Sequence, residues 1–199
     1  MPISQSNATL ASPLTLMGAA LAWDDIRIEP IIRAGGGANA PTFEVWDTNG
    51  AGSRGIFLYS FDNASAGNEK EMQFRMQMPH SWDGTAVFFH CHWKPNTSEN
   101  AVVRWGLEYT WSGIGQTFAT TTIVYGSVAT PLESLVAKRH YLTSIATLTP
   151  GAGQAGASVV LIGRLFRDSA NGADTYTDKV GLLSIDMHYR INKLGDASV

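Results

Sequence analysis

Strict alternation of apolar and polar residues recurs along this chain, and it limits the possible folds more than any other feature. Three segments show it most clearly: residues 72–78, 103–111 and 183–191. Successive side chains of a β-strand point to opposite faces, so each of these segments buries one face and exposes the other. A helix would scatter the same apolar residues around its circumference. The pattern therefore predicts half-buried β-strands.

Other apolar runs are rich in Thr and Val and also predict strands. They are residues 42–46, 55–61, 85–93, 117–127, 139–148 and 157–166, with turn-forming clusters between them. About nine strands joined by turns favour an all-β fold, an antiparallel β-sandwich with jelly-roll-like topology. A closed lipocalin-like barrel is the alternative. Residues 131–138 alone have a helical pattern, about two turns long.

The first forty residues differ from the rest of the chain. Residues 1–22 are polar and small and contain Pro2 and Pro13, and three glycines at 35–37 form a flexible joint. We therefore expect an extended N-terminal arm over residues 1–40 and the β-sandwich domain over residues 41–199. Such an arm has no core of its own and gains order by lying on another subunit.

The charge content is low, and it excludes several classes of partner. Charged residues make up 16% of the chain against about 25% in typical proteins, and the net charge is −3. The largest basic cluster is the pair Lys138-Arg139, which is too small for nucleic-acid binding. No apolar run reaches 18 residues, so we expect no membrane span. A surface with few charges favours contacts with protein partners. The single cysteine is compatible with folding in a reducing cytoplasm.

The most chemical-looking motif is His90-Cys91-His92. On a strand the two histidines share a face, with backbone positions about 7 Å apart, which suits chelation of one divalent ion. Gly84 precedes them at a spacing that resembles the first half of the cupin metal motif. The cupin glutamate is missing, since Asn96 and Thr97 occupy its expected positions, and its second motif is absent after residue 100. A cupin-like metal enzyme is thus a lesser alternative, and His90 and His92 are the candidate metal ligands.

Two other motifs have structural explanations. Cys91 points away from both histidines, so it lacks a base within reach and is expected to be a buried apolar residue. Residues 151–156 match the dinucleotide-binding pattern G-x-G-x-x-G, but a predicted strand follows them where that motif requires a helix. We therefore expect a hairpin loop there and no cofactor. His80, His140 and His188 have no partner at ligand spacing in the sequence.

The six tryptophans divide into two groups. Trp93, Trp105 and Trp111 occupy apolar positions of predicted strands and should fill the core. The other three lie near the ends of segments, where an aromatic ring often anchors a partner. The candidate interface residues are Trp23, Trp46 and Trp82.

Several motifs resemble a family of tailed-bacteriophage proteins encoded near virion genes. They are residues 78–84 (MPHSWDG), 90–93 (HCHW), 105–111 (WGLEYTW), 182–189 (LLSIDMHY) and 194–195 (LG), and the resemblance covers about residues 40–195. It implies a β-sandwich component of the virion, folded in the host cytoplasm and assembled as a homo-oligomer, with a trimer expected. A capsid decoration (cement) protein or head-fibre protein is the first expectation, bound to the major capsid protein or other virion proteins. A tail adaptor or a receptor- or carbohydrate-binding module is the second. We expect no enzymatic activity.

Overall fold

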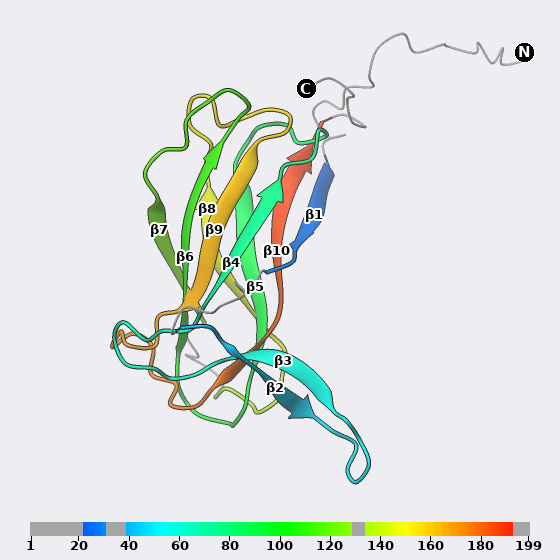
Figure 1. Ribbon diagram of the computed structural model, residues 1–199, viewed down its shortest axis with the longest axis vertical. Coiled ribbons are helices and arrows are strands. Elements are labelled where there is room, and N and C mark those ends of the chain that lie inside the picture. The colour runs from blue at the N-terminus through cyan, green and yellow to red at the C-terminus, as the bar shows by residue number, and fades with distance from the viewer. Residues whose placement is uncertain (1–21, 31–38, 129–133, 193–199) are drawn as a thin grey trace, which may run out of the picture.

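The computed structural model describes residues 22–30, 39–128 and 134–192, and they form two antiparallel sheets packed face to face (Figure 1). The strands are β1 (Ala22–Ile28), β2 (Thr42–Asp47), β3 (Ile56–Phe61), β4 (Glu71–Gln77), β5 (Val87–Pro95), β6 (Val103–Ser112), β7 (Thr122–Val128), β8 (Tyr141–Leu148), β9 (Val160–Arg167) and β10 (Val180–Ile191). The described part of the chain contains no helix that could span a membrane.

The strand order is that of a jelly roll. The larger sheet runs β2–β3–β10–β5–β8, with β1 also paired to β10, and the smaller sheet runs β4–β9–β6–β7. From β3 to β10 every connection except the β6–β7 hairpin crosses from one sheet to the other. Two interleaved Greek keys produce this path. The antiparallel sandwich and the jelly-roll topology expected from the sequence are confirmed.

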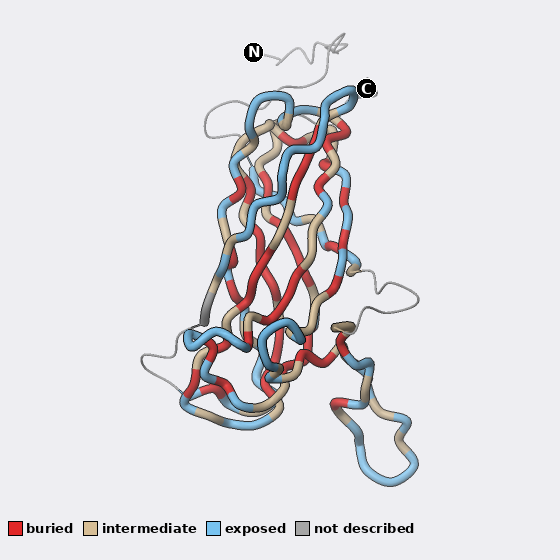
Figure 2. Tube along the Cα trace, turned by 60° about the vertical axis from the view of Figure 1, so that its left-hand side comes forward, coloured by how far each residue is buried: buried red, intermediate tan, exposed pale blue. Residues whose placement is uncertain are grey.

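The core lies between the sheets and follows the alternation seen in the sequence. In β4, buried Met72, Phe74 and Met76 alternate with exposed polar residues. Trp93 and Trp105 are fully buried, and their indole centroids lie 6.4 Å apart across the sandwich. Figure 2 shows the buried segments running through the middle of the sandwich. Burial of large side chains of this kind contributes roughly 1.5–3 kcal/mol each.

The strand β1 corrects the expected domain boundary at residue 40. Its residues Ala22 to Ile28 pair in register with Ile191 to Ile185 of β10. Strand β3 covers the same edge of β10 over residues 180–182 alone, so the remaining edge needs another partner. An arm over all of residues 1–40 is therefore wrong for residues 22–28, which belong to the sandwich. The expected arm residues 1–21 and 31–38 lie outside the described residues.

The expected helix over residues 131–138 is also wrong within residues 134–138. There Leu135 is fully buried and exchanges two backbone hydrogen bonds with Glu99 in an isolated bridge. A two-turn helix gains too few hydrogen bonds to offset its nucleation cost, so burial of one leucine decides the conformation. Residues 151–156 lie in the loop between β8 and β9 and are followed by a strand, as predicted. The expected hairpin is wrong, because this loop crosses from the larger sheet to the smaller one.

Candidate functional site

The hairpin of β2 and β3 projects from one end of the sandwich (Figures 1 and 2). Strand β3 pairs with β2 over its length but with β10 only through Tyr59, Ser60 and Phe61. The outer part of the hairpin therefore has no pairing with β10 and extends past the end of the larger sheet.

Large apolar side chains cover this hairpin without being buried. Ile56 is 63% exposed and Phe43 is 57% exposed, and Val45 and Phe57 are also exposed. The Phe43 ring centroid lies 5.3 Å from that of Phe57 and 4.8 Å from that of Tyr59, so the aromatic rings form one cluster. Single exposed apolar residues are ordinary, but a cluster of them on a projecting element marks a binding surface.

The buried side chain of Trp46 packs at the base of the hairpin. Its ring is 8% exposed, and the ammonium groups of Lys94 and Lys179 each lie 5.6 Å from the ring centroid. The ring packs on Gly181 so closely that a Cβ there would come within 3.0 Å of it. A partner has no access to a ring held in this way. The expected interface role of Trp46 is therefore wrong.

Ion pairs around Trp46 tie the hairpin to the sandwich. Glu44 Oε1 lies 2.8 Å from Lys179 Nζ, and Asp47 pairs with both Lys94 and Lys138. The hydrogen bond from Lys179 lowers the pKa of Glu44, and the hydrogen bond from Lys94 lowers the pKa of Asp47. Both carboxylates are therefore ionised at neutral pH, and the pairs link the hairpin to the sandwich.

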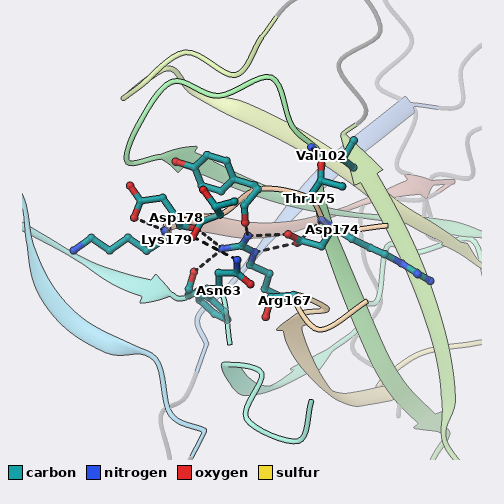
Figure 3. A network of polar contacts seen from close by, with 12 residues as sticks. Asn63, Val102, Arg167, Asp174, Thr175, Asp178 and Lys179 are labelled. Atoms are coloured by element: carbon teal, nitrogen blue, oxygen red, sulfur yellow. Dashed lines mark hydrogen bonds and ion pairs between the residues drawn. The ribbon is translucent and has the colours of Figure 1, made fainter. Parts of the chain in front are cut away.

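A buried arginine fixes the inner end of β3. The guanidinium of Arg167 donates two hydrogen bonds to Asp174, of 3.0 Å from Nε and 2.8 Å from Nη2 (Figure 3). It donates others to the backbone carbonyls of Phe61, Asp178 and Tyr176. Arg167 and Asp174 have no exposed side-chain surface. This network joins the end of β3 to the loop between β9 and β10, so the root of the hairpin is rigid.

A cleft of about 820 Å³ lies beside the hairpin on the outer face of the larger sheet. The aromatic side is formed by Phe43, Phe57 and Tyr59, and residues 182–185 of β10 also line the cleft. The polar lining comes from several elements and includes Asp25, Arg27, Glu29, His92, His140, Asp186 and His188. The cleft thus combines aromatic rings with hydrogen-bonding groups.

Four of the five histidines gather around Asp186 on this outer face. His92 Nε2 lies 3.2 Å from Asp186 Oδ1, and His188 Nε2 lies 3.2 Å from Asp186 Oδ2. The His90 ring centroid is 4.3 Å from that of His188, and His92 Nδ1 is 2.7 Å from His140 Nε2. Burial lowers the pKa of His90, and the charge of His188 adds to the shift. The His90 ring is therefore neutral at neutral pH, the form that binds metals.

The structure changes the set of candidate metal ligands. It brings donor atoms of His90, Asp186 and His188 within 4.8 Å of one another, whereas His92 is not part of that group. Metal binding by His90 stays a prediction, and His92 takes a neighbouring position. Sequence reasoning missed Asp186 and His188, although they share a face of one predicted strand. The missing information was the register, which places Asp186 opposite His90.

Of the other two tryptophans expected at an interface, one is buried. Trp82 is 4% exposed, packs 6.0 Å from Trp111 and donates a hydrogen bond of 3.1 Å to the carbonyl of Thr85. Its expected interface role is wrong, because the loop folds back over the end of the core. Trp23 is 55% exposed and lies beside Phe88, so its interface role stays a prediction.

Cys91 lies in the core with no exposed surface. Burial raises the pKa of its thiol well above the ordinary value, so no reactive thiolate forms at neutral pH. This agrees with the expectation that Cys91 is a structural residue.

No protein-family model and no curated protein matches this chain. Among solved structures it is similar to one of infectious bursal disease virus Gx strain, with 10% identity over 92% of this chain and 38% of that chain, at a TM-score of 0.41. It is also similar to the CBM22-1-GH10 modules of the Clostridium thermocellum xylanase Xyn10B, solved with xylohexaose. That match has 11% identity over 71% of this chain and 26% of that chain, at a TM-score of 0.33. TmCBM61 in complex with β-1,4-galactotriose has 11% identity to this chain. The match covers 86% of this chain and 88% of that chain, at a TM-score of 0.26. The chain thus spans less than two fifths of the first two proteins, and its fold assignment rests on its own strand order.

Proposed function

We propose that this chain is a structural protein of a tailed-bacteriophage virion that acts by binding other copies of itself, and not by catalysis. The observation that carries the proposal is the projecting β2–β3 hairpin, which is rigid at its root and apolar at its surface. The resemblance of several motifs to those of tailed-phage virion proteins supports the same role. A capsid decoration protein or a head-fibre protein fits a compact jelly roll with one protruding contact element.

The composition of the surface favours a second copy of this chain as the partner that binds the hairpin. The hairpin offers apolar and aromatic side chains, which bind surfaces with few charges. This chain has 16% charged residues, and exposed Ile123, Ile162 and Tyr125 lie on the smaller sheet. A contact between the hairpin of one copy and a different surface of the next would be head-to-tail, and such contacts form a ring when the rotation between neighbouring copies closes. A trimer is the ring that we propose.

The assembly can be tested with one pair of matched variants. Ile56 on the hairpin is 63% exposed, and Ile114 in the β6–β7 loop at the opposite end of the sandwich is 65% exposed (Figure 1). Loss of one buried isoleucine contact costs roughly 1.5–3 kcal/mol, so Ile56→Ser should weaken association by roughly 10–100-fold. Light scattering over a dilution series measures this shift. Ile114→Ser should leave association unchanged.

A monomeric wild-type chain at every concentration would contradict the proposal, and so would equal effects of the two variants. The place on the particle has a separate test, the copy number per virion. Hundreds of copies indicate the shell, whereas a dozen or fewer indicate the tail.

The cleft supports a second candidate, a glycan-binding module of the virion. Sugars bind to exposed aromatic rings flanked by hydrogen-bonding groups, and Phe43 and Tyr59 line the cleft together with polar side chains. Trp82, one of the candidate interface residues, is buried and has no access to a glycan. Binding on a glycan array that is lost on Tyr59→Ala but kept on Tyr125→Ala would favour this candidate. No bound glycan for the wild-type chain would exclude it.

A further inference from the structure

Three potential metal ligands converge on the outer face of the larger sheet. Asp186 and His188 are two residues apart on β10, so their side chains emerge on the same face. The register of β5 against β10 places His90 directly opposite Asp186. One donor atom from each of the three lies within 4.8 Å of the others. Two adjacent central strands therefore present two imidazoles and one carboxylate at one point.

Buried polar atoms at this point lack hydrogen-bond partners. His90 and Asp186 are each 7% exposed, yet His90 Nδ1 and Asp186 Oδ1 are buried without a hydrogen bond. Asp186 Oδ1 lies 3.2 Å from His92 Nε2, close enough for an ion pair but without hydrogen-bond geometry. An unsatisfied buried polar atom costs roughly 1–3 kcal/mol, so such atoms in a native structure indicate a missing partner.

We propose that His90, Asp186 and His188 form a binding site for a divalent transition-metal ion of the zinc class. Two imidazole nitrogens and one carboxylate oxygen suit Zn²⁺, Co²⁺ or Ni²⁺, whereas Ca²⁺ and Mg²⁺ prefer oxygen ligands throughout. Bonds of about 2.0–2.2 Å place the donors of one ion roughly 3–3.5 Å apart, a distance that small side-chain rotations reach from the present positions. The ion would bind the two central strands of the larger sheet together.

The neighbouring side chains suit an outer shell for such an ion. His92 lies against the carboxylate of Asp186, and His140 contacts the other nitrogen of His92. Partners of this kind orient metal ligands, and their loss typically lowers metal affinity by about 10–100-fold. Because Asp186 and His188 also line the cleft, open coordination positions would be accessible from solvent.

Metal titration of the untagged full-length chain tests the site. After treatment with a chelator, ZnCl₂ is titrated by calorimetry, and CoCl₂ provides an absorption spectrum that reports nitrogen and oxygen coordination. We expect one ion per chain. His188→Ala should lower the zinc affinity by more than about 100-fold, beyond the effect of an outer-shell residue. Asp186→Asn should do the same, and circular dichroism verifies that each variant is folded.

His140→Ala is the matched control, because it removes a histidine from the same face but not a proposed ligand. Because His140 contacts His92, which is not a proposed ligand, its loss should change the affinity by less than about tenfold, below the effect of a residue that contacts a ligand directly. Absence of saturable binding below millimolar zinc would overturn the proposal. Equal loss in His140→Ala and His188→Ala would also overturn it, since the ion would then rest on His92 and His140. His188 is partly exposed, so its variant stays informative even if Asp186→Asn unfolds. The test does not depend on the proposed role in assembly.

Discussion

Substitution of Asp174 by asparagine would remove the negative charge that pairs with the buried guanidinium of Arg167. Both side chains are completely buried, and the two hydrogen bonds between them measure 3.0 and 2.8 Å. Asp174 Oδ2 also accepts a hydrogen bond of 2.9 Å from the backbone N–H of Arg104. The asparagine has nearly the same shape, so the perturbation is one of charge and hydrogen bonding and not of packing.

The expected cost follows from this burial. Removal of one partner of a buried ion pair leaves an uncompensated charge and typically costs about 3–5 kcal/mol. For a domain of about 150–250 residues each kcal/mol lowers the melting temperature by roughly 2–4 °C. Asp174→Asn should therefore lower the melting temperature by about 6–20 °C. Because Arg167 also holds the carbonyl of Phe61, the root of the hairpin should loosen as well.

Urea denaturation followed by tryptophan fluorescence measures the change in the free energy of unfolding. An unchanged slope of this free energy against urea concentration indicates that unfolding exposes the same surface area in both proteins. Glu108→Gln is the control, since its ion pair with Arg164 is partly exposed and should contribute less than about 1 kcal/mol. An Asp174→Asn variant within 1 kcal/mol of the wild type would refute the reasoning that the buried pair holds this end of the sandwich.

Three further predictions concern separate parts of the molecule. Burial alone would raise the pKa of Asp83, but its hydrogen bonds, one of them from Arg190, lower it overall. The stabilisation by Asp83 is therefore fully present above the unfolded-state pKa of about 3.9 and is lost as the pH falls through the lower folded-state pKa. In Asp83→Asn the free energy of unfolding, measured by urea denaturation between pH 6 and 2, should fall less steeply with decreasing pH than in the wild type. Gly106→Ala places a Cβ 2.2 Å from the ring of Phe166 and should cost about 1–3 kcal/mol in thermal unfolding. Cys91 should react with a thiol reagent no faster than the chain unfolds, and rapid labelling of the native protein would show that it is accessible.

The sandwich could be predicted from the sequence because the signal for it is local. Alternation in residues 72–78 and 103–111 defines which face of each strand is buried, whatever the strand pairs with. Strand β1 was missed because its acidic residues Asp24 and Asp25 interrupt the apolar pattern. Its place in the sheet is set by the uncovered edge of β10, which no local pattern reports.

The candidate sites depend on pairing and could be predicted only in part. The sequence indicated His90 as a metal ligand, but the convergence with Asp186 and His188 depends on the register between β5 and β10. Residues near strand ends are equally difficult to assign. Trp46 becomes buried because the hairpin folds it over Gly181, a contact between segments more than a hundred residues apart in the sequence.

Site-specific photo-cross-linking from the hairpin tests the proposed assembly most directly. A photoreactive amino acid placed at Ile56 should, on irradiation of the assembled protein, form a covalent dimer whose cross-linked peptides both belong to this chain. The same amino acid at Ile114 should form no such product. Cross-links from position 56 that stay within one chain, or equal products from both positions, would contradict the claim that the hairpin binds a neighbouring copy.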